Sequence, residues 1–478
     1  MFKKIAICLF LVAFCAGARA ADTNSLVWHR AADRVDADVR GMALWPLLEK
    51  IAVEAGWHIY VEPDTTHTAS AKFNDLPSGA ALKMLLGNLN FALVPRTNDV
   101  PQLYVFRTDM KNATRQVLAP RAAPRHVANE LLVKLKPGTD ADALARLVGA
   151  KITGRNDKLG LYRFLFDNAA ATDAALASLK NNSDVLAVDY NYYFDPPPPV
   201  QALSSAPVAP VSLKLTPTTT GDPCNPVVGM IDTGMQSLGS QLDPFILKPI
   251  SVVGDAAANT SGSTRVQSLG NQIDEFAPEQ VSQAGQNTVF PTHGTAMAET
   301  ILRAVSQASG GSSSVRILPV NVYGSDEMTT SWNVALGIQA AVDNGATILN
   351  LSLGGSGDSA VLDGVIQQAI AAGIPVYAAA GNQPVNTPTY PAATPGVIAV
   401  TATQGSQLAP YANFGGFVSI ALPGSSVIYL GGQSFLVQGT SPATAYATGV
   451  AAGTRGVNCL TWAQIQAAML QTYPVPAK

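Results

Sequence analysis

The sequence has 478 residues, of which 47% are hydrophobic and 13% charged, with 40 glycines and 32 prolines. This composition is typical of a globular protein with roughly two or three domains and excludes a collagen-like or disordered chain. The formal net charge of −3 provides no basic field for a phosphate backbone, so the composition argues against nucleic-acid binding. Only five histidines are present, which restricts the choice of imidazole for base-assisted chemistry.

Residues 1–20 have the features of an export signal. Two lysines precede an apolar run from Ile5 to Ala16, and small residues on both sides of Arg19 supply a signal-peptidase site. The apolar run is shorter than the ~20 residues that span a bilayer, which argues against a membrane anchor. We therefore expect residues 1–20 to be a signal peptide and the protein to be exported, either secreted or periplasmic.

Removal of the signal would leave two cysteines, Cys224 and Cys459, in an oxidising compartment. An even number of cysteines in such a compartment makes them candidates for a disulfide. Two unpaired buried thiols are the alternative, since the sequence does not show whether the two side chains meet.

Charge is distributed unevenly along the chain. Residues 22–195 contain 20 acidic and 20 basic side chains, whereas residues 196–478 contain 13 acidic and 7 basic ones. Four consecutive prolines open a Pro/Ser/Thr-rich run, residues 196–223, which predicts an extended and exposed linker.

Residues 30–110 alternate amphipathic helices and short strands. Apolar spacing predicts a helix that ends at Gly56 and a second helix before Gly87, which Ser78 is expected to cap. Strands are expected at 58–61, 91–94 and 103–106, which gives a small α+β domain. The apolar pattern resembles the short N-terminal domain of secretins and TonB-dependent transducers. This resemblance implies an interaction module with an envelope protein partner, in a Gram-negative bacterium, and no chemistry of its own.

Residues 126–195 follow a β-α-β-β-α-β order. The expected strands are 131–136, 151–153, 161–166 and 185–193, and the expected helices are 140–148 and 173–180. Thr139 and Thr172 are predicted to cap those helices. Two helices on one face of an antiparallel sheet form the ferredoxin-like arrangement, which by itself says nothing about function.

From residue 226 onward, apolar strands alternate with helices, which is typical of a parallel sheet covered on both faces. The expected strands are 227–231, 315–322, 346–353, 374–379 and 397–401, and the expected helices are 292–308, 331–344, 359–372 and 441–455. In such sheets the chemistry lies where strands end and helices begin.

Three short motifs fall at such positions. Asp232 ends an apolar strand in Val-Val-Gly-Met-Ile-Asp-Thr-Gly, where a buried carboxylate is costly unless something donates to it. His293 begins a helix in Thr-His-Gly-Thr, and Ser441 follows a Gly-Thr turn before a proline that suits the first helical turn. Each motif alone is more typical of a turn or a helix cap.

Together these residues satisfy the requirements of nucleophilic serine catalysis. Ser441 would lie at a helix N-terminus, where the dipole favours a developing oxyanion. His293 is the only histidine within residues 196–478, so it is the only base available there, and a carboxylate must orient it. Asn382, at the tip of a small-residue turn, could donate its amide to the oxyanion together with the backbone N–H of Ser441.

The order Asp232, His293, Ser441 and the blocks Asp-Thr-Gly, His-Gly-Thr, Gly-Asn and Gly-Thr-Ser-x-Ala strongly resemble the subtilisin-like serine proteases, or subtilases. The resemblance covers residues 227–468. It implies an α/β fold for a catalytic domain at residues 224–478, namely a subtilisin-like doubly wound parallel sheet with helices on both faces.

The resemblance also implies residue roles. Ser441 would attack the scissile carbonyl, His293 would take its proton and later protonate the leaving amine, and Asp232 would hold the imidazole. Asn382 would stabilise the oxyanion. Positions matching the family's substrate-binding residues are Ser352, Leu353 and Gly354 on one side of the substrate, Tyr323, Gly324 and Ser325 on the other, and Ala380, Gly381 and residues 390–392 around the pocket before the scissile bond.

Some positions depart from the family pattern. Pro442 and Ala445 stand where the family commonly has Met and Pro, which implies altered helix packing and not a loss of activity. Residues 256–290 are long, polar and unmatched. The resemblance implies no required cofactor, and no acidic cluster indicates a calcium site, although loop carbonyls could form one.

The place of residues 126–195 before the catalytic domain resembles that of the family's propeptide. Such a propeptide assists folding and acts as an intramolecular inhibitor by presenting its tail, here residues 190–223, to the active site. The alternative is a permanent accessory domain.

The sequence therefore predicts an exported serine endopeptidase, a hydrolase of polypeptide substrates, made as a zymogen with autoprocessing in the linker. Two alternatives stay open. One is a catalytically idle envelope peptide-binding protein, and the other is a transpeptidase or macrocyclase on the same fold.

Overall fold

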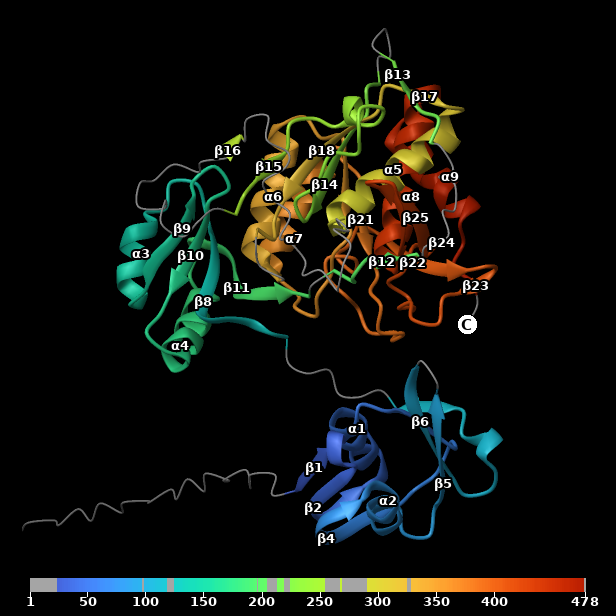
Figure 1. Cartoon of the computed structure of the whole chain (residues 1–478). Coiled ribbons are helices and arrows are strands. Elements are labelled where there is room, and N and C mark those ends of the chain that lie inside the picture. The colour runs from blue at the N-terminus through green and yellow to red at the C-terminus, as the bar shows by residue number, and fades with distance from the viewer. Residues whose placement is uncertain are drawn as a thin grey trace, which may run out of the picture. The chain divides into compact units, whose positions relative to one another are not determined.

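The computed structural model describes residues 24–96, 99–117, 124–195, 197–203, 213–218, 224–253, 267–268, 290–324 and 328–476 (Figure 1). The expected signal peptide, much of the linker and most of the unmatched stretch 256–290 lie outside the described residues. The chain divides into two compact units between Ala122 and Ala123. No helix within the described ranges is long and apolar enough to cross a membrane.

The first unit is an α+β domain with its own core. Its elements are β1 (Ser25–His29), a 3-10 turn (Arg30–Ala32), β2 (Arg34–Ala43), α1 (Leu44–Ala55), β3 (His58–Val61), β4 (Thr68–Pro77), α2 (Ser78–Leu86), β5 (Asn90–Arg96), β6 (Asp99–Phe106), a 3-10 turn (Met110–Asn112) and β7 (Arg115–Val117). The strands form two sheets, in the orders β1-β2-β4 and β5-β6-β3-β7. Apolar side chains four residues apart on α1, such as Leu47 and Ile51, are fully buried in this core.

The prediction that Ser78 caps α2 is wrong. Ser78 is the first residue of the helix, and the preceding cap position is Pro77, which has no side-chain hydrogen bond. The Ser78 hydroxyl is buried, accepts a hydrogen bond from Trp28 Nε1 at 3.0 Å and donates to Asp33. Its hydrogen bonds therefore link three distant parts of the chain and leave the helix terminus without a side-chain cap.

The second unit begins with the predicted β-α-β-β-α-β region. Its elements are β8 (His126–Leu135), α3 (Ala141–Val148), β9 (Lys151–Asn156), β10 (Leu161–Leu165), α4 (Ala169–Leu179) and β11 (Val185–Phe194). All neighbouring strands of the sheet β11-β8-β10-β9 are antiparallel. In β8, Leu131 and Val133 face α3 and α4, whereas Leu132 belongs to the core shared with the α/β domain, so the continuous apolar run is buried on both faces.

Both predicted threonine caps in this region are wrong. Asp140, not Thr139, caps α3 by accepting the Ala143 N–H at 3.0 Å. Asn168 caps α4, which begins earlier than expected, and Thr172 lies inside that helix with its hydroxyl donating to the Asn168 carbonyl. An Asx side chain one residue after Thr139 and another four residues before Thr172 accept these N–H groups of the first helical turn instead.

The α/β domain contains a nine-stranded sheet in the order β16-β15-β18-β14-β20-β21-β22-β23, with β24 also paired to β22. Its strands are β14 (Val227–Asp232), β15 (Ile250–Ser251), β16 (Gln267–Ser268), β18 (Arg316–Asn321), β20 (Ile348–Leu351), β21 (Val376–Ala379), β22 (Ile398–Gln404), β23 (Gln407–Leu408) and β24 (Ile420–Pro423). Its central strands are parallel, as predicted.

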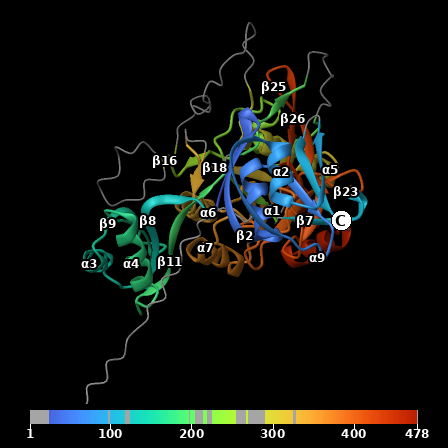
Figure 2. The same cartoon turned by 90° about the horizontal axis from the view of Figure 1, so that it is seen from below.

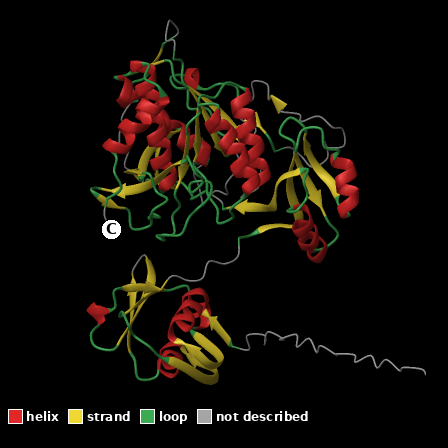
Figure 3. Cartoon of the chain, turned by 180° about the vertical axis from the view of Figure 1, so that it is seen from behind, coloured by secondary structure: helices red, strands yellow, loops and turns green. Residues whose placement is uncertain are grey.

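Helices cover both faces of this sheet (Figure 3). One face packs against α5 (His293–Ser309), α8 (Thr440–Asn458) and α9 (Trp462–Thr472), and the other against α6 (Ser331–Asp343) and α7 (Ala360–Ala371). The predicted fold, a doubly wound sheet preceded by two small α+β regions, is therefore confirmed. The remaining elements are β12 (Gln201–Ala202), β13 (Thr216–Pro217), a 3-10 turn (Asp243–Phe245), β17 (Ser312–Ser313), β19 (Thr329–Thr330), β25 (Ser425–Leu430) and β26 (Gln433–Gln438).

The β8–β11 sheet lies against α6 and α7, as the two views in Figures 1 and 2 agree. The β11 strand extends this sheet into the α/β domain, where Tyr193 and Phe194 pair with Thr330 and Thr329.

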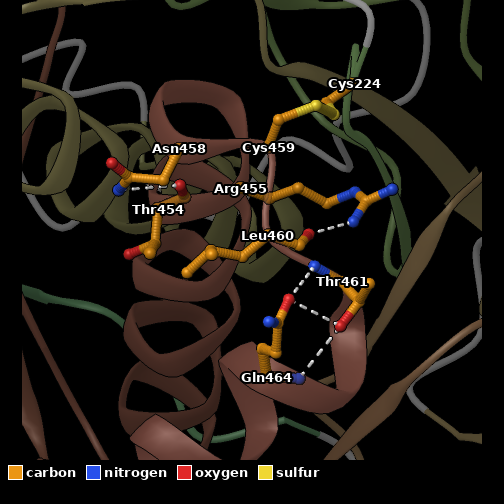
Figure 4. The surroundings of a disulfide bond; sticks show 8 residues. All are labelled: Cys224, Thr454, Arg455, Asn458, Cys459, Leu460, Thr461 and Gln464. Atoms are coloured by element: carbon orange, nitrogen blue, oxygen red, sulfur yellow. Dashed lines mark hydrogen bonds between the residues drawn. A yellow bond between two sulfur atoms is a disulfide. The ribbon is translucent and has the colours of Figure 1, made fainter.

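A disulfide joins Cys224 to Cys459, with the two Cα atoms 5.6 Å apart and a sequence separation of 235 residues (Figure 4). Cys459 follows α8 directly and adopts a left-handed conformation, with φ of 50°. Arg455 on α8 donates to the Leu460 carbonyl and lies over the Trp462 ring, which fixes the turn into α9. The bridge therefore ties the start of the α/β domain to the end of the helix that carries Ser441.

We expect replacement of both cysteines by serine to lower the free energy of unfolding by about 2–5 kcal/mol, because the bridge constrains a very long loop of the unfolded chain. Urea unfolding of the C224S/C459S variant and of the wild type, each with and without reductant, measures the difference. Reductant should destabilise only the wild type. Equal stability of the two oxidised proteins would contradict the prediction.

Candidate active site

Asp232 lies at the carboxyl end of β14, in the middle of the sheet, and is only 1% exposed. Its Oδ1 accepts the Thr233 N–H at 2.7 Å and lies 2.8 Å from His293 Nδ1. These two donors offset the cost of burying a carboxylate at this position. The carboxylate and the imidazole, which are 61 residues apart in sequence, are therefore directly hydrogen-bonded.

The small and hydroxylated residues of the two motifs explain this contact. His293 is the first residue of α5, and a side chain on the next residue, Gly294, would place its Cβ 2.4 Å from the Thr233 carbonyl oxygen. Gly294 donates its N–H to Thr233 Oγ1 at 2.8 Å, and Thr292 Oγ1 donates to the Gly234 carbonyl at 2.7 Å. The Asp-Thr-Gly and His-Gly-Thr motifs thus bind each other and fix the first turn of α5 against the end of β14.

Ser441 is the second residue of α8 and follows Gly439, whose φ of 145° lies in the region that favours glycine. Its hydroxyl donates to the Ser352 carbonyl at 3.1 Å, and Ser352 Oγ donates back to the Ser441 carbonyl at 3.0 Å. His293 Nε2 is buried and has no hydrogen-bond partner among the described residues. In this form of the chain, the serine hydroxyl therefore bonds to the backbone of residue 352 and not to the imidazole.

Asn382 lies just after β21, and its Oδ1 accepts the Thr440 N–H at 2.8 Å and the Thr440 hydroxyl at 3.1 Å. Thr440 Oγ1 also accepts the Gly381 N–H at 3.0 Å. The amide oxygen is thus held by the residue before Ser441. This arrangement leaves Nδ2 as the end of the side chain that can donate to an oxyanion at the start of α8.

The other expected substrate-binding residues lie around this centre. Leu353 is buried in the core under α6 and α7, and Gly354 packs against Thr389, while Gly355 forms a backbone bridge with Tyr390. Ala380 is fully buried beside Gly381. Within the described ranges, no group of three His, Cys, Asp or Glu side chains could hold a metal ion.

Tyr323 and Gly324, which are expected on the opposite side of the substrate, lie just after β18. The N–H groups of Tyr323 and Gly324 both bond to Asn321 Oδ1 at 3.1 Å, and Ser325 lies outside the described residues. The edge that pairs with an extended chain is β19, Thr329–Thr330, a few residues further on. Two consecutive β-branched residues before the α6 helix were the only sequence signal for this edge.

Sequence reasoning also missed Asn413, which is 1% exposed. Its Nδ2 donates to the Ala380 carbonyl at 2.9 Å and to Thr389 Oγ1 at 3.0 Å, and its Oδ1 accepts the Gln383 N–H at 2.8 Å. Asn413 thus connects both ends of the loop that carries Asn382. No motif around residue 413 indicates this role, because its partners are all distant in sequence.

Comparisons with known proteins agree with this geometry. Residues 224–476 match the subtilase family, and residues 112–191 match the fervidolysin N-terminal prodomain. The family match covers more than half of the chain, so the chain belongs to the subtilase family, as the motifs predicted.

Two curated relatives illustrate the match. Subtilisin BL of Lederbergia lenta is 33% identical over 179 residues, which is 36% of this chain and 66% of that protein. Alkaline elastase YaB of Bacillus sp. (strain YaB) is 35% identical over 181 residues, 36% of this chain and 47% of the relative. The chain thus spans about half to two thirds of the length of these relatives.

A solved structure matches over a longer part of the chain. It is fervidolysin of Fervidobacterium pennivorans, a keratinolytic enzyme related to subtilisin. The TM-score is 0.51 at 18% identity, covering 73% of this chain and 57% of that one. At this identity the likeness shows the fold alone.

We expect Asn413→Ala to lower the free energy of unfolding by about 1–3 kcal/mol, because it leaves buried backbone groups of the Asn382 loop without partners. The matched control is Asn386→Ala, since Asn386 is an exposed asparagine of the same loop. Denaturant unfolding of both variants measures the effect. Equal stability of the two variants would show that the Asn413 hydrogen bonds do not hold the loop.

Proposed function

We propose that the protein is an exported serine endopeptidase made as a zymogen. The observation that carries this proposal is the buried hydrogen bond between Asp232 and His293, in a chain of the subtilase family that carries Ser441 in the first turn of α8, a helix packed against the helix of His293. The export signal at residues 1–20 and the disulfide, which favours an oxidising compartment, support export.

The geometry supports an acyl-transfer mechanism. After rotation of its hydroxyl from Ser352 toward the imidazole, Ser441 Oγ attacks the carbonyl carbon of the scissile bond, and its proton passes to His293 Nε2. Asp232 accepts the Nδ1–H and stabilises the imidazolium. The oxyanion receives hydrogen bonds from Asn382 Nδ2 and the Ser441 N–H. His293 then protonates the leaving nitrogen as the C–N bond breaks, and water hydrolyses the acyl-enzyme through the same base.

We propose that residues 126–195 act as an intramolecular propeptide. Their sheet contacts the N-termini of two helices of the α/β domain. Asn191, fully buried and held by Glu130 at 3.1 Å, accepts the Trp332 N–H of α6 at 3.0 Å. Asp189 accepts the N–H groups of Ala360 and Val361 at the start of α7. These polar contacts add to the helices' own caps, Thr330 and Ser359, because they supply partners for further N–H groups of the first turns.

An ion pair and apolar packing support the same interface. Lys158 lies 2.6 Å from Asp343 at the end of α6. Phe194 is 1% exposed within the core that includes Trp332 and Leu353. A region that bonds to the N-termini of α6 and α7 and contributes Phe194 to the core can assist folding of the α/β domain. The same region can block access to the active site.

We also propose that the first unit, which corresponds to residues 30–110, is an interaction module with an envelope protein partner. Its support is the sequence pattern and a core that is separate from the second unit. In the described residues, each outer strand of its two sheets has one edge without a neighbouring strand. A partner strand could add to the backbone groups of such an edge.

We expect Ser441→Ala to reduce hydrolysis of a denatured protein substrate by ~10⁶-fold, by analogy with removal of the nucleophile in other subtilases. Precursor processing should stop as well. Ser425→Ala, at an exposed serine of β25, is the matched control and should leave both unchanged. A fluorophosphonate probe should label the control and not the Ser441 variant. Equal labelling or equal turnover would refute the proposal and favour an idle binding protein.

The propeptide contact should weaken as the pH rises. Burial raises the pKa of Asp189 to about 6, and the nearby Asp358 acts in the same direction, while the α7 N–H groups and Lys180 oppose it. Because the pKa is raised in the folded chain, the stabilisation is complete below the unfolded pKa of ~4 and is lost as the pH passes through the folded value.

Asp189→Asn stays neutral at every pH. We therefore expect its unfolding free energy, relative to that of the wild type, to rise by about 1–3 kcal/mol as the pH increases from 5 to 8. Both proteins carry Ser441→Ala to prevent cleavage during urea unfolding. Asp184→Asn, at an exposed carboxylate before β11, is the matched control and should follow the wild type. A constant difference between Asp189→Asn and wild type across this pH range would contradict the expectation.

A further inference from the structure

Gln236 lies in the chain segment that follows β14, and its side-chain amide bonds to the two residues that flank Pro291. Its Oε1 accepts the Thr292 N–H at 2.9 Å, and its Nε2 donates to the Phe290 carbonyl at 2.9 Å. A single amide therefore fixes the backbone directly before His293 through one donor and one acceptor.

Gln236 also bonds to the first turn of α5. The Gln236 N–H donates to Thr295 Oγ1 at 2.8 Å, and the Thr295 hydroxyl donates to Gln236 Oε1 at 2.7 Å. In a capping box, the third helical residue is Glu or Gln, and its side chain accepts the N–H of the cap residue. In α5 the cap residue is Thr292, and the third residue is Thr295, which has a shorter side chain. Gln236 thus supplies, from a distant segment, the acceptor that the helix lacks at its third position.

We refer to these four hydrogen bonds as the Gln236 clamp, which holds the backbone on both sides of His293, at residues 290, 292 and 295. The imidazole itself has one hydrogen bond within the described residues, from Nδ1 to Asp232, and Nε2 has no partner there. The position of the ring therefore depends on the backbone that carries it. Because Gln236 lies four residues after Asp232, the clamp ties that backbone to the segment of the carboxylate.

The clamped segment also contacts the strand that leads to Ser441. Phe290 is the residue at which the described chain resumes before α5, and its ring lies edge-on against Phe435 of β26, with the ring centroids 5.5 Å apart. The Phe435 side chain is fully buried. Strand β26 ends directly before Gly439 and the turn that presents the serine. The segment held by Gln236 is therefore connected to the chain of Ser441 as well.

We propose that Gln236 is a positioning residue for His293, which holds the first turn of α5 so that Nε2 can take the proton of Ser441. The proposal rests on the proposed serine endopeptidase function. None of the four bonds of the clamp reaches Ser441, Asn382 or residues 352–354. Gln236 therefore acts through the imidazole and not on the substrate.

The kinetic test is the Gln236→Met variant, whose side chain has a similar length but cannot form the side-chain bonds of the clamp. We expect kcat for a peptide substrate to fall by ~10–100-fold, because a displacement of about 1 Å is enough to impair a catalytic group. KM should change by less than ~2-fold, because the substrate-binding residues are untouched. Each protein is produced as the full-length chain and allowed to process, and its rate is divided by the active sites titrated with a fluorophosphonate probe.

A second measurement reads the position of the imidazole without any hydrolysis. In the full-length Ser441→Ala chain, the proton on His293 Nδ1 that bonds to the buried Asp232 carboxylate should give a far-downfield proton resonance in the NMR spectrum. In the Q236M/S441A double variant we expect this resonance to broaden or vanish, because a less firmly held ring exchanges the proton with water faster. A residue that only adds stability would leave the resonance unchanged.

Two further variants make the result specific. Gln236→Glu keeps the acceptor for Thr292 and Thr295 and loses only the donor to Phe290, so its kcat should lie between those of the wild type and Gln236→Met. The comparison is made on the alkaline plateau of activity, where His293 is neutral in every variant. The matched control is Gln307→Ala, which removes a glutamine bonded to Tyr446 near the other end of α5 and should behave as the wild type in kcat and in the resonance.

The outcomes separate the clamp from the enzyme activity. Wild-type kcat and an unchanged resonance in both Gln236 variants would overturn the proposal, whatever their thermal unfolding temperatures. A Gln236→Glu variant that folds but is no faster than Gln236→Met would overturn it as well. If the wild type hydrolyses nothing while the resonance is present in Ser441→Ala and lost in Q236M/S441A, the proposed function fails, and only the role of Gln236 in holding the imidazole is supported.

Discussion

The buried carboxylate of Asp232 is the constraint on which the rest of the site depends. A charge at the end of a central parallel strand needs donors, and within the described part of the chain the Thr233 N–H and the His293 imidazole supply them. The imidazole reaches this point because Gly294 lets the first turn of α5 approach the Thr233 carbonyl. The hydrogen bonding of the Asp232 carboxylate therefore determines where α5, which covers one face of the sheet, begins.

Small residues also let the helices that carry His293 and Ser441 pack closely. Helices α5 and α8 pack directly together in the core, and two glycines on α8, Gly449 and Gly453, face α5 at their closest approach. A Cβ at Gly449 would lie 2.4 Å from the Ile301 carbonyl oxygen, and one at Gly453 would lie 3.1 Å from Val305 Cα. Because α5 begins at His293, α8 carries Ser441 in its first turn and the two helices meet through these glycines, helix packing fixes the positions of both candidate catalytic residues.

Sequence reasoning found the parts of the fold that carry strong local signals. The parallel strands, the covering helices and the three motif residues were predicted because apolar periodicity and short motifs are local. The caps at Thr139 and Thr172 were wrong because the helices begin at other residues than expected: α3 begins one residue later, after Asp140, and α4 begins four residues earlier, after Asn168. The two-residue strands β12 and β19 have no periodicity at all. Asn413 was missed because its three partners are brought to it only by the tertiary fold.

The disulfide has a defined place in this arrangement. Cys224 stands directly after the linker and Cys459 directly after α8, so both cysteines belong to the α/β domain. Cleavage between residues 203 and 224 would separate residues 126–195, with their contacts on α6 and α7, covalently from the α/β domain but leave the bridge intact. The new chain start would remain covalently attached to the helix that carries Ser441. The bridge can therefore hold the domain together after the loss of contacts such as those of Asn191 and Phe194, which stabilise it only while the propeptide is bound.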